Sequence, residues 1–283
     1  MKITGETKLI GIFGFPVAHS LSPQMQNAAF EAMGVNICYV PLEVKPQDLN
    51  KALLGIRAMH FLGANVTIPH KVQVASLVDR LDASAAMTGA VNTVVNESGT
   101  LIGHNTDGVG FINAIKEVAT INFQDESALL LGAGGAARAI AAALAEQGIK
   151  KLALVNRTRH RAQEIDALIS ANFTGVKTIV LTPEDIEDSL IESCKIVINA
   201  TSIGLEGDLK MPSVRVDRLT KDHVVCDIVY TQTQETPFLV AARGKGATTL
   251  GGLGMLLHQG AAAIRLWTGI EAPIDIMRGA IEP

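Results

Sequence analysis

One stretch of this chain, residues 128–161, constrains the fold more than any other. It begins with an apolar run of strand length at 128–131, turns through the glycine-rich residues 132–136, continues as a helix of small residues and ends in a second apolar run at 152–155. Glycines permit a tight turn and a close approach of the backbone to phosphate, and a helix N-terminus presents N–H groups to an anion. The stretch therefore predicts a strand–turn–helix–strand unit that binds the pyrophosphate of a dinucleotide.

The residues that follow the second apolar run indicate which dinucleotide binds. Proteins that bind NAD usually place an acidic residue there, against the ribose 2′-hydroxyl. This chain has Asn156 and Arg157 instead, followed by Arg159 and Arg161. A carboxylate would repel a 2′-phosphate, whereas guanidinium groups can form paired hydrogen bonds with it. We expect NADP, with NAD as the alternative, since some of these arginines could instead form the solvated first turn of a surface helix.

Length and composition limit the classes of protein to consider. At 283 residues the chain is long enough for two domains, because single hydrophobic cores stop growing at about 250–300 residues. A hydrophobic content of 48% with 18% charged residues is typical of an α/β enzyme with a buried parallel sheet. The net charge of −4 argues against binding of nucleic acid or of an anionic membrane surface.

The cysteines and the N-terminal residues bear on the location of the protein. Cys38, Cys194 and Cys226 are widely spaced in apolar runs, which is typical of core residues in a reducing compartment and not of disulfides or zinc ligands. The first residues lack the long apolar core of a signal peptide. The apolar stretch 128–145 contains Arg138 and several glycines, which disfavour a membrane-spanning helix. We therefore expect a cytoplasmic protein.

Apolar runs of strand length alternate with helical patterns along the chain, which predicts parallel β/α architecture. Helices are expected from Ser22-Pro23 and from Pro46, with Ser22 as a possible cap, and a Ser98-Gly99 turn predicts a hairpin. The amphipathic stretch 253–268 predicts one long helix that returns to the first domain. The other expected elements are strands at 9–15, 38–42, 61–66, 91–96, 100–103, 177–181, 195–199, 223–227 and 248–250 and a helix at 107–118.

Unusual polar residues follow several of the predicted strands, where open α/β sheets bind their ligands. Ser20 and Ser22 on a turn entering a helix could hold a carboxylate. Lys71 could be a solvated lysine or, if it faces a cleft, an acid or base. Asp107 could be a helix N-cap or the anionic partner of Lys71. Gln259 could lie on the surface or bind a polyol.

Eight motifs, taken together and in order, identify a family that the chain resembles. They extend from about Gly11 to Trp267, nearly the whole chain, and read HSLSP, NVTIPHK, AVNT, NTDG, GAGGAAR, NRT, NATSIG and GMLLHQGA. This order resembles the shikimate dehydrogenase family, which includes the quinate/shikimate dehydrogenases. The resemblance implies an α/β fold with an N-terminal, mostly parallel β/α substrate domain, a Rossmann dinucleotide-binding domain and a cleft between them.

The resemblance also implies domain boundaries and a reaction. The substrate domain would comprise residues 1–107, completed by C-terminal helices at about 253–283, and the NAD(P)-binding domain residues 108–252. The reaction would be the reversible reduction of 3-dehydroshikimate to shikimate by NADPH. The ligand would be a small hydroxylated cyclohexane or cyclohexene carboxylate, and monomer and homodimer both stay open.

Roles are implied for the residues that match the family motifs. Lys71 and Asp107 resemble the catalytic pair. The expected substrate-binding residues are Ser20, Ser22, Thr67, Asn92, Tyr230 and Gln259. The expected cofactor-binding residues are Gly132, Ala133, Gly134, Gly135, Ala136, Asn156, Arg157, Thr158, Arg161, Thr201 and Gly252. No His, Cys or Asp cluster has the spacing of metal ligands, so no metal is expected.

Departures from the family pattern leave alternatives open. Gly251 stands where biosynthetic members commonly have an acidic residue, and His70 where many have an aromatic one. The segment HSLSPQMQN is closer to the quinate/shikimate branch. The alternatives are a quinate/shikimate dehydrogenase that uses NAD or NADP, a member acting on an altered cyclohexane acid, and a non-catalytic NAD(P)-binding paralogue. The presence of both Lys71 and Asp107 argues against the last.

Overall fold

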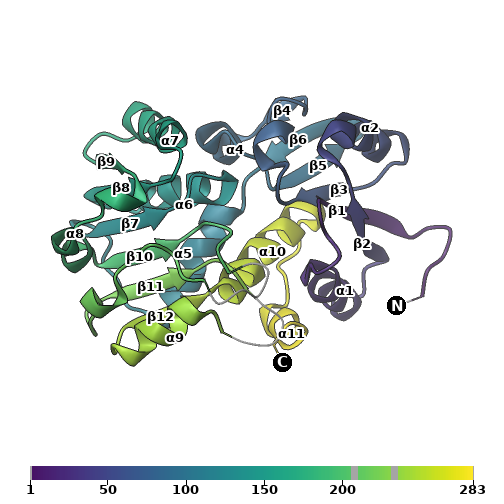
Figure 1. Cartoon of the computed structure of the whole chain (residues 1–283). Helices are drawn as coiled ribbons and strands as arrows, with labels where there is room; N and C mark the ends of the chain where they lie inside the picture. Colours follow the sequence, from purple (N-terminus) through teal and green to yellow (C-terminus); the bar gives the residue numbers. More distant parts are fainter. Residues whose placement is uncertain (1, 205–209, 231–234, 283) are drawn as a thin grey trace. The chain divides into compact units, whose positions relative to one another are not determined.

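The computed structural model describes residues 2–204, 210–230 and 235–282, shown in Figure 1. The chain divides into two compact units, Met1–Gly110 with Leu256–Pro283 and Phe111–Met255. Both boundaries fall inside helices, α5 (Asp107–Val118) and α10 (Gly252–Thr268). The predicted helix at 107–118 is confirmed, and the predicted helix at 253–268 begins one residue earlier.

The first unit is built on a six-stranded sheet in the order β2-β1-β3-β5-β6-β4. β1 is parallel to both β2 and β3, and the predicted hairpin is confirmed as the antiparallel pair β5–β6. Its turn has positive φ at Ser98 and Gly99, the geometry that matches the twist of paired strands. The strands are β1 (Lys8–Gly14), β2 (Ile37–Glu43), β3 (Gly63–Val66), β4 (Arg80–Leu81), β5 (Thr93–Glu97) and β6 (Thr100–His104).

Helix α1 (Ser22–Ala32) begins one residue earlier than a Ser22 cap would require. Its N-cap is Leu21, and no side-chain hydrogen bond caps it. Ser22 is the first helical residue and is buried, so the interpretation of Ser22 as a cap is wrong. Proline is tolerated at the next position because first-turn N–H groups have no helical partner. The other helices of this unit are η1 (Pro46–Asp48), α2 (Leu49–Ala58), α3 (Lys71–Val74), α4 (Ala83–Thr88) and α11 (Ile274–Gly279).

The second unit contains the predicted Rossmann sheet, six parallel strands in the order β12-β11-β10-β7-β8-β9. Sequence order reverses between β7 and β10, which is the point where such sheets bind dinucleotides. The strands are β7 (Ser127–Leu131), β8 (Lys151–Val155), β9 (Lys177–Leu181), β10 (Ile196–Asn199), β11 (Val224–Asp227) and β12 (Thr248–Gly251).

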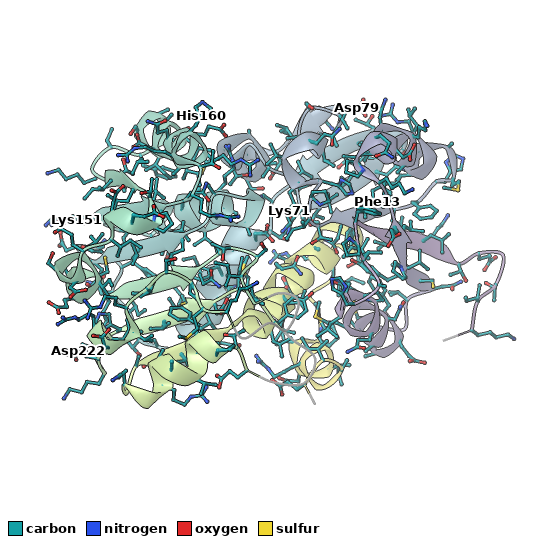
Figure 2. All side chains as sticks on the ribbon, viewed as in Figure 1. Phe13, Lys71, Asp79, Lys151, His160 and Asp222 are labelled. Carbon is teal, nitrogen blue, oxygen red and sulfur yellow. The ribbon has the colours of Figure 1, made fainter. Side chains whose placement is uncertain are left out.

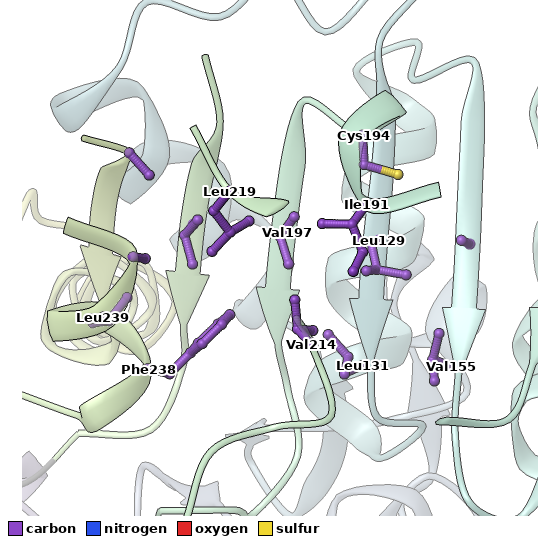
Figure 3. Close-up of a cluster of buried hydrophobic side chains, with 14 residues drawn as sticks. Leu129, Leu131, Val155, Ile191, Cys194, Val197, Val214, Leu219, Phe238 and Leu239 are labelled. Carbon is purple, nitrogen blue, oxygen red and sulfur yellow. The ribbon is translucent and has the colours of Figure 1, made fainter. Parts of the chain in front are cut away.

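Apolar side chains of this sheet pack against the helices of the unit. Figure 3 shows Leu129, Val197 and Phe238 in one buried cluster with Cys194. The remaining elements are α6 (Gly135–Glu146), α7 (Arg159–Asn172), η2 (Pro183–Asp185), α8 (Asp188–Ser193), η3 (Val216–Arg218) and α9 (Pro237–Gly244).

The three cysteines are free and buried, as predicted. Burial raises the pKa of the Cys194 thiol to about 11. Within the described ranges, no helix combines the length and the apolar character needed to cross a bilayer.

Candidate active site

Lys71 and Asp107 form an ion pair in the first unit. Lys71, labelled in Figure 2, begins α3 shortly after β3, and Asp107 begins α5 after β6. Lys71 Nζ lies 2.6 Å from Asp107 Oδ2, and the Asp107 side chain is only 3% exposed. A charge-assisted bond this short holds the ammonium group in one place. Asp107 is the first residue of α5, and its carboxylate bonds to Lys71 and Asn92.

Asn92 connects this pair to helix α10. Its Nδ2 donates to Asp107 Oδ1 at 3.0 Å and to Gln259 Oε1 at 3.2 Å. Its Oδ1 accepts from the Thr106 backbone N–H at 2.8 Å. The residue is 2% exposed in total, so the orientation of its amide is set by these partners. Four chain segments that are distant in sequence thus meet at one hydrogen-bonded cluster.

Two more polar residues form a hydrogen-bonded network with the backbone of Asn92 and with its neighbour Thr93. Asn65, at the end of β3, donates to the Asn92 carbonyl at 3.1 Å and to Thr93 Oγ1 at 3.0 Å. Tyr39 donates its hydroxyl proton to Asn65 Oδ1 at 2.6 Å. Sequence reasoning did not assign roles to Asn65, Tyr39 or Thr106. Asn65 and Thr106 lie inside quoted motifs, which was a usable signal, whereas Tyr39 lies in a strand that gave none.

Gln259 is positioned by its own helix and by a close crossing with α5. Its Nε2 donates to the Leu256 carbonyl at 2.8 Å. A Cβ on Gly110 would lie 2.7 Å from the Gln259 backbone nitrogen, so only glycine allows the two helices to approach this closely. The half-buried Gln259 amide therefore faces Asn92 as a consequence of backbone packing.

The other predicted substrate-binding residues of the first unit lie at the start of α1 and just after β3. Ser20 Oγ accepts from the Ser22 backbone N–H at 3.3 Å, which folds the turn that precedes α1. Thr67 follows β3 and its N–H donates to Phe13 O at 2.8 Å. Ser20 lies in the turn before α1, Ser22 is the first residue of that helix, and Thr67 lies four residues before Lys71.

His70 precedes Lys71 and is completely buried. Its Nε2 lies 2.7 Å from the Val44 carbonyl, which can only accept, so the proton is on Nε2. In the described part of the chain its Nδ1 has no hydrogen-bond partner. Burial lowers the pKa of His70, opposed in part by the bond to Val44. The folded protein therefore favours the neutral imidazole.

His70 should make the free energy of unfolding depend on pH. Because the pKa is lower in the folded state than its ordinary value of 6.5, the unfolded chain binds more protons, and stability falls as the pH drops below about 6.5. His70→Phe lacks this contribution. As the pH falls from about 8 to 5, the wild type should therefore lose more unfolding free energy than the variant does. Urea titrations between about pH 5 and pH 8 measure it, and a difference independent of pH would contradict it.

The glycine-rich turn of the second unit has the features of a pyrophosphate cradle. Gly132 has φ +109°, and a Cβ there would lie 2.5 Å from the Ala200 carbonyl. Gly134 is exposed and is the N-cap of α6, which continues from Gly135 through Ala136. Apart from its chain neighbours, no described heavy atom lies within 4 Å of a Cβ built on Gly134. The turn thus leaves open space in front of a helix N-terminus, and Ala133 lies between the two glycines.

The turn after β8 exposes positive charge. Arg157 and Thr158 are exposed, and Asn156 donates to the Thr158 carbonyl at 2.9 Å, which shapes the turn. Arg161 is also exposed, in the first turn of α7. Arg159 instead bonds to Asp185 at 3.3 Å and to the Val180 carbonyl at 3.0 Å. Of these arginines, Arg159 is already bonded to neighbouring residues, whereas Arg157 and Arg161 are exposed around the turn.

A buried polar network lies at the ends of β10 and β11. Thr201 Oγ1 donates to Asn199 Oδ1 at 2.6 Å, and Asn199 Nδ2 donates to Asp227 Oδ1 at 2.9 Å. Burial raises the pKa of the Asp227 carboxyl, while the Thr236 hydroxyl, which donates to it, lowers it. This network shapes the loop that carries Thr201.

Two further predicted residues lie in the second unit near β11 and β12. A Cβ on Gly252 would lie 2.3 Å from the Ile228 carbonyl, so the backbone is closely packed at the start of α10. Tyr230 follows β11 by three residues and is half-buried. Metal-ligating side chains do not gather in groups of three or more anywhere in the ranges that the structure describes.

Three family models match successive parts of the chain. The one described as shikimate dehydrogenase substrate binding domain matches residues 12–94. The one described as shikimate/quinate 5-dehydrogenase matches residues 114–240, and the shikimate 5′-dehydrogenase C-terminal domain matches residues 252–282.

Individual relatives agree over nearly the full length. The chain is 41% identical to a shikimate dehydrogenase (NADP(+)) of Desulforamulus reducens, covering 99% of this chain and 96% of that one. The structure of shikimate 5-dehydrogenase from Thermus thermophilus in complex with NADP(H) and shikimate has a TM-score of 0.85 and 34% identity, covering 97% of this chain and 98% of that one. Quinate dehydrogenase from Corynebacterium glutamicum in complex with NAD has a TM-score of 0.87 and 34% identity, with the same coverage of 97% and 98%. The chain belongs to the shikimate dehydrogenase family.

Proposed function

We propose that this chain catalyses the reversible reduction of 3-dehydroshikimate to shikimate with NADPH. The observation that carries the proposal is the cluster in which Lys71, Asp107, Asn92 and Gln259 share hydrogen bonds. It combines an ammonium group that can donate a proton with neutral amides that suit ring hydroxyl groups. The relatives called shikimate dehydrogenase (NADP(+)), at about 40% identity, support the same assignment.

Lys71 is the proposed acid–base residue. In the reductive direction its ammonium group donates a proton to the oxygen that becomes the new hydroxyl, and in the oxidative direction the amine accepts that proton. Asp107 holds Nζ in position and stabilises its charge.

The remaining polar residues orient the ring. Ser20 and Ser22 hold the carboxylate, and Thr67, Asn92 and Gln259 hold hydroxyl groups. The hydrogen bonds of Asn92 and Gln259 within the cluster fix the directions of their amide groups before the substrate binds. The motif resemblance adds Tyr230 to the substrate-binding residues.

The second unit fits NADP, which supplies the hydride when bound. The open turn at Gly132–Gly135, with Ala133 and Ala136, would hold the pyrophosphate. Asn156, Arg157, Thr158 and Arg161 would hold the 2′-phosphate, and Thr201 and Gly252 are further proposed cofactor-binding residues. Substrate binding is thus assigned to residues 1–107 with 253–283, and dinucleotide binding to residues 108–252. We place the reaction in the cytoplasm, which suits three free thiols.

Initial rates of NAD(P)H formation test the function directly. Shikimate and quinate are each paired with NADP⁺ and NAD⁺. Turnover of shikimate with NADP⁺ is the expected result. Faster turnover of quinate would assign the chain to the quinate branch. Two observations favour that branch: Gly251 replaces the acidic residue common in biosynthetic members, and the chain is similar to a quinate dehydrogenase from C. glutamicum. Cofactor binding with no turnover in any pair would support a non-catalytic paralogue.

Replacing both Arg157 and Arg161 by alanine should remove the preference for NADP. Each charge-assisted bond to a 2′-phosphate is worth about 10- to 100-fold in affinity, so KM for NADP⁺ should rise by at least about 10-fold while KM for NAD⁺ stays nearly constant. Arg159→Ala is the matched control, because it removes the same charge from a residue already bound to Asp185. An equal rise in KM for both cofactors would contradict the assignment.

A further inference from the structure

Helix α1 buries a polar side chain for which the proposed mechanism has no role. Gln26 is 0% exposed, and it lies one helical turn after the buried Ser22. Residues four apart lie on the same face of a helix, so Gln26 shares the face of Ser22. Burying a long amide side chain is costly unless its polar atoms find partners.

The amide of Gln26 bonds to helix α10 next to the proposed substrate-binding glutamine. Gln26 Nε2 donates to the Gly260 carbonyl at 3.2 Å. The two helices are in close contact at this point, since a Cβ on Gly260 would lie 2.4 Å from Met25 Cε and 3.1 Å from Gln26 Nε2. The bond therefore attaches α10 to α1 one residue beyond Gln259.

Gln259 depends on the position of α10 for its own orientation. Its Nε2 bonds to Leu256 of the same helix, and its Oε1 accepts from Asn92. A small rotation or slide of α10 would move this amide relative to Asn92 and to the ring hydroxyl groups. The bond from Gln26 restrains that movement.

Stability alone does not account for an amide at this position. Among the described residues, Gln26 Oε1 has no hydrogen-bond partner although it is buried, and an unsatisfied buried acceptor lowers stability. The Gly260 carbonyl lies inside a regular helix, where it also accepts the usual backbone bond. An apolar residue of similar volume would remove the unsatisfied atom and leave that carbonyl bonded.

We propose that Gln26 is a positioning residue for the substrate, which acts by holding α10 so that Gln259 meets the ring hydroxyl groups. The inference rests on the proposed function, in which Gln259 binds substrate. It predicts a specific combination of effects for Gln26→Met. KM for the substrate should rise about 3- to 10-fold, the range of one hydrogen bond, kcat should change less than about 2-fold, and the melting temperature should stay level or increase.

Gln24→Met is the matched control. Gln24 lies on the same helix and also donates to a backbone carbonyl of the C-terminal segment, Ala280 O at 3.0 Å, but it is exposed and its bond goes to Ala280 and not to α10. Its KM should equal that of the wild type. Gln26→Leu repeats the test with a second apolar side chain, in case methionine packs poorly.

Binding is measured without turnover through Trp267, the single tryptophan of the chain. It lies on α10 and donates to the Val94 carbonyl at 3.0 Å, so its emission reports the position of α10, and a change in emission on addition of shikimate gives Kd. If the wild type is active and both Gln26 variants keep its KM and Kd, the inference about Gln26 is wrong while the proposed function stands. A lower melting temperature with normal KM, or an equal KM increase in Gln24→Met, also overturns the inference. A wild type inactive on shikimate and on quinate rejects the proposed function and the inference with it.

Discussion

Lys71→Ala should lower kcat by about 10²- to 10⁴-fold, the usual contribution of a positioned acid–base group. The ammonium group proposed to donate the proton is removed, and Asp107 loses the partner that lies 2.6 Å from its Oδ2. NADPH affinity should stay within about 2-fold, because the residues proposed to bind the dinucleotide belong to the other unit. Initial rates and fluorescence titration with NADPH measure the two effects separately.

The control for Lys71→Ala is Lys51→Ala. Lys51 is also paired with an aspartate, Asp48, at 2.9 Å, but its side chain is 81% exposed. Its loss removes the same charge from the same unit and should leave kcat unchanged. Near-normal turnover in Lys71→Ala would reject the acid–base assignment, and loss of NADPH binding would show that the variant had disturbed the whole fold.

Gly132→Ala should destabilise the second unit by about 3 kcal/mol, which combines strain at a positive φ with overpacking. A Cβ there lies 2.5 Å from the Ala200 carbonyl, which is backbone of the neighbouring loop and cannot rotate away. For a unit of this size the melting temperature should fall by roughly 6–12 °C. Thermal unfolding followed by circular dichroism measures the change.

Gly134→Ala is the matched substitution in the same turn. Gly134 has φ −85°, which any residue adopts, and a methyl group there would point into open space. The apo protein should therefore keep its melting temperature. The added methyl group would occupy the space assigned to the pyrophosphate, so KM for NADP⁺ should rise by about 10-fold or more. Equal melting temperatures for the two variants would contradict this division of roles.

The dinucleotide-binding unit could be predicted in detail because its signals are local. The glycine turn, the alanine-rich helix and the two flanking strands lie within 34 consecutive residues, 128–161, and their hydrophobic patterns depend only on near neighbours. The start of α1 shows the limit of such signals. A serine before a proline fits both the N-cap and the first helical position, and only the backbone angles at Leu21 distinguish them.

The polar cluster around Lys71 could be predicted as a set of residues but not as an arrangement. The motifs indicated Lys71, Asn92, Asp107 and Gln259, yet for Asp107 a helix cap remained an open alternative. The decisive contacts come from the register of β3, β5 and β6, which brings Asn92 and Thr106 together. The contact of Tyr39 with Asn65 could not be predicted, because the strand that contains Tyr39 has an ordinary apolar pattern.

By itself, the sequence determined the α/β class, the Rossmann unit, the family and the chemical types of the site residues. These properties follow from periodicity, turn chemistry and motif order along the chain. Only the tertiary structure decided which polar atoms meet and which stay unsatisfied, as with Gln26, whose partner Gly260 lies 234 residues away. Contacts of that kind depend on strand register and helix contact, and a one-residue shift of either exchanges every partner.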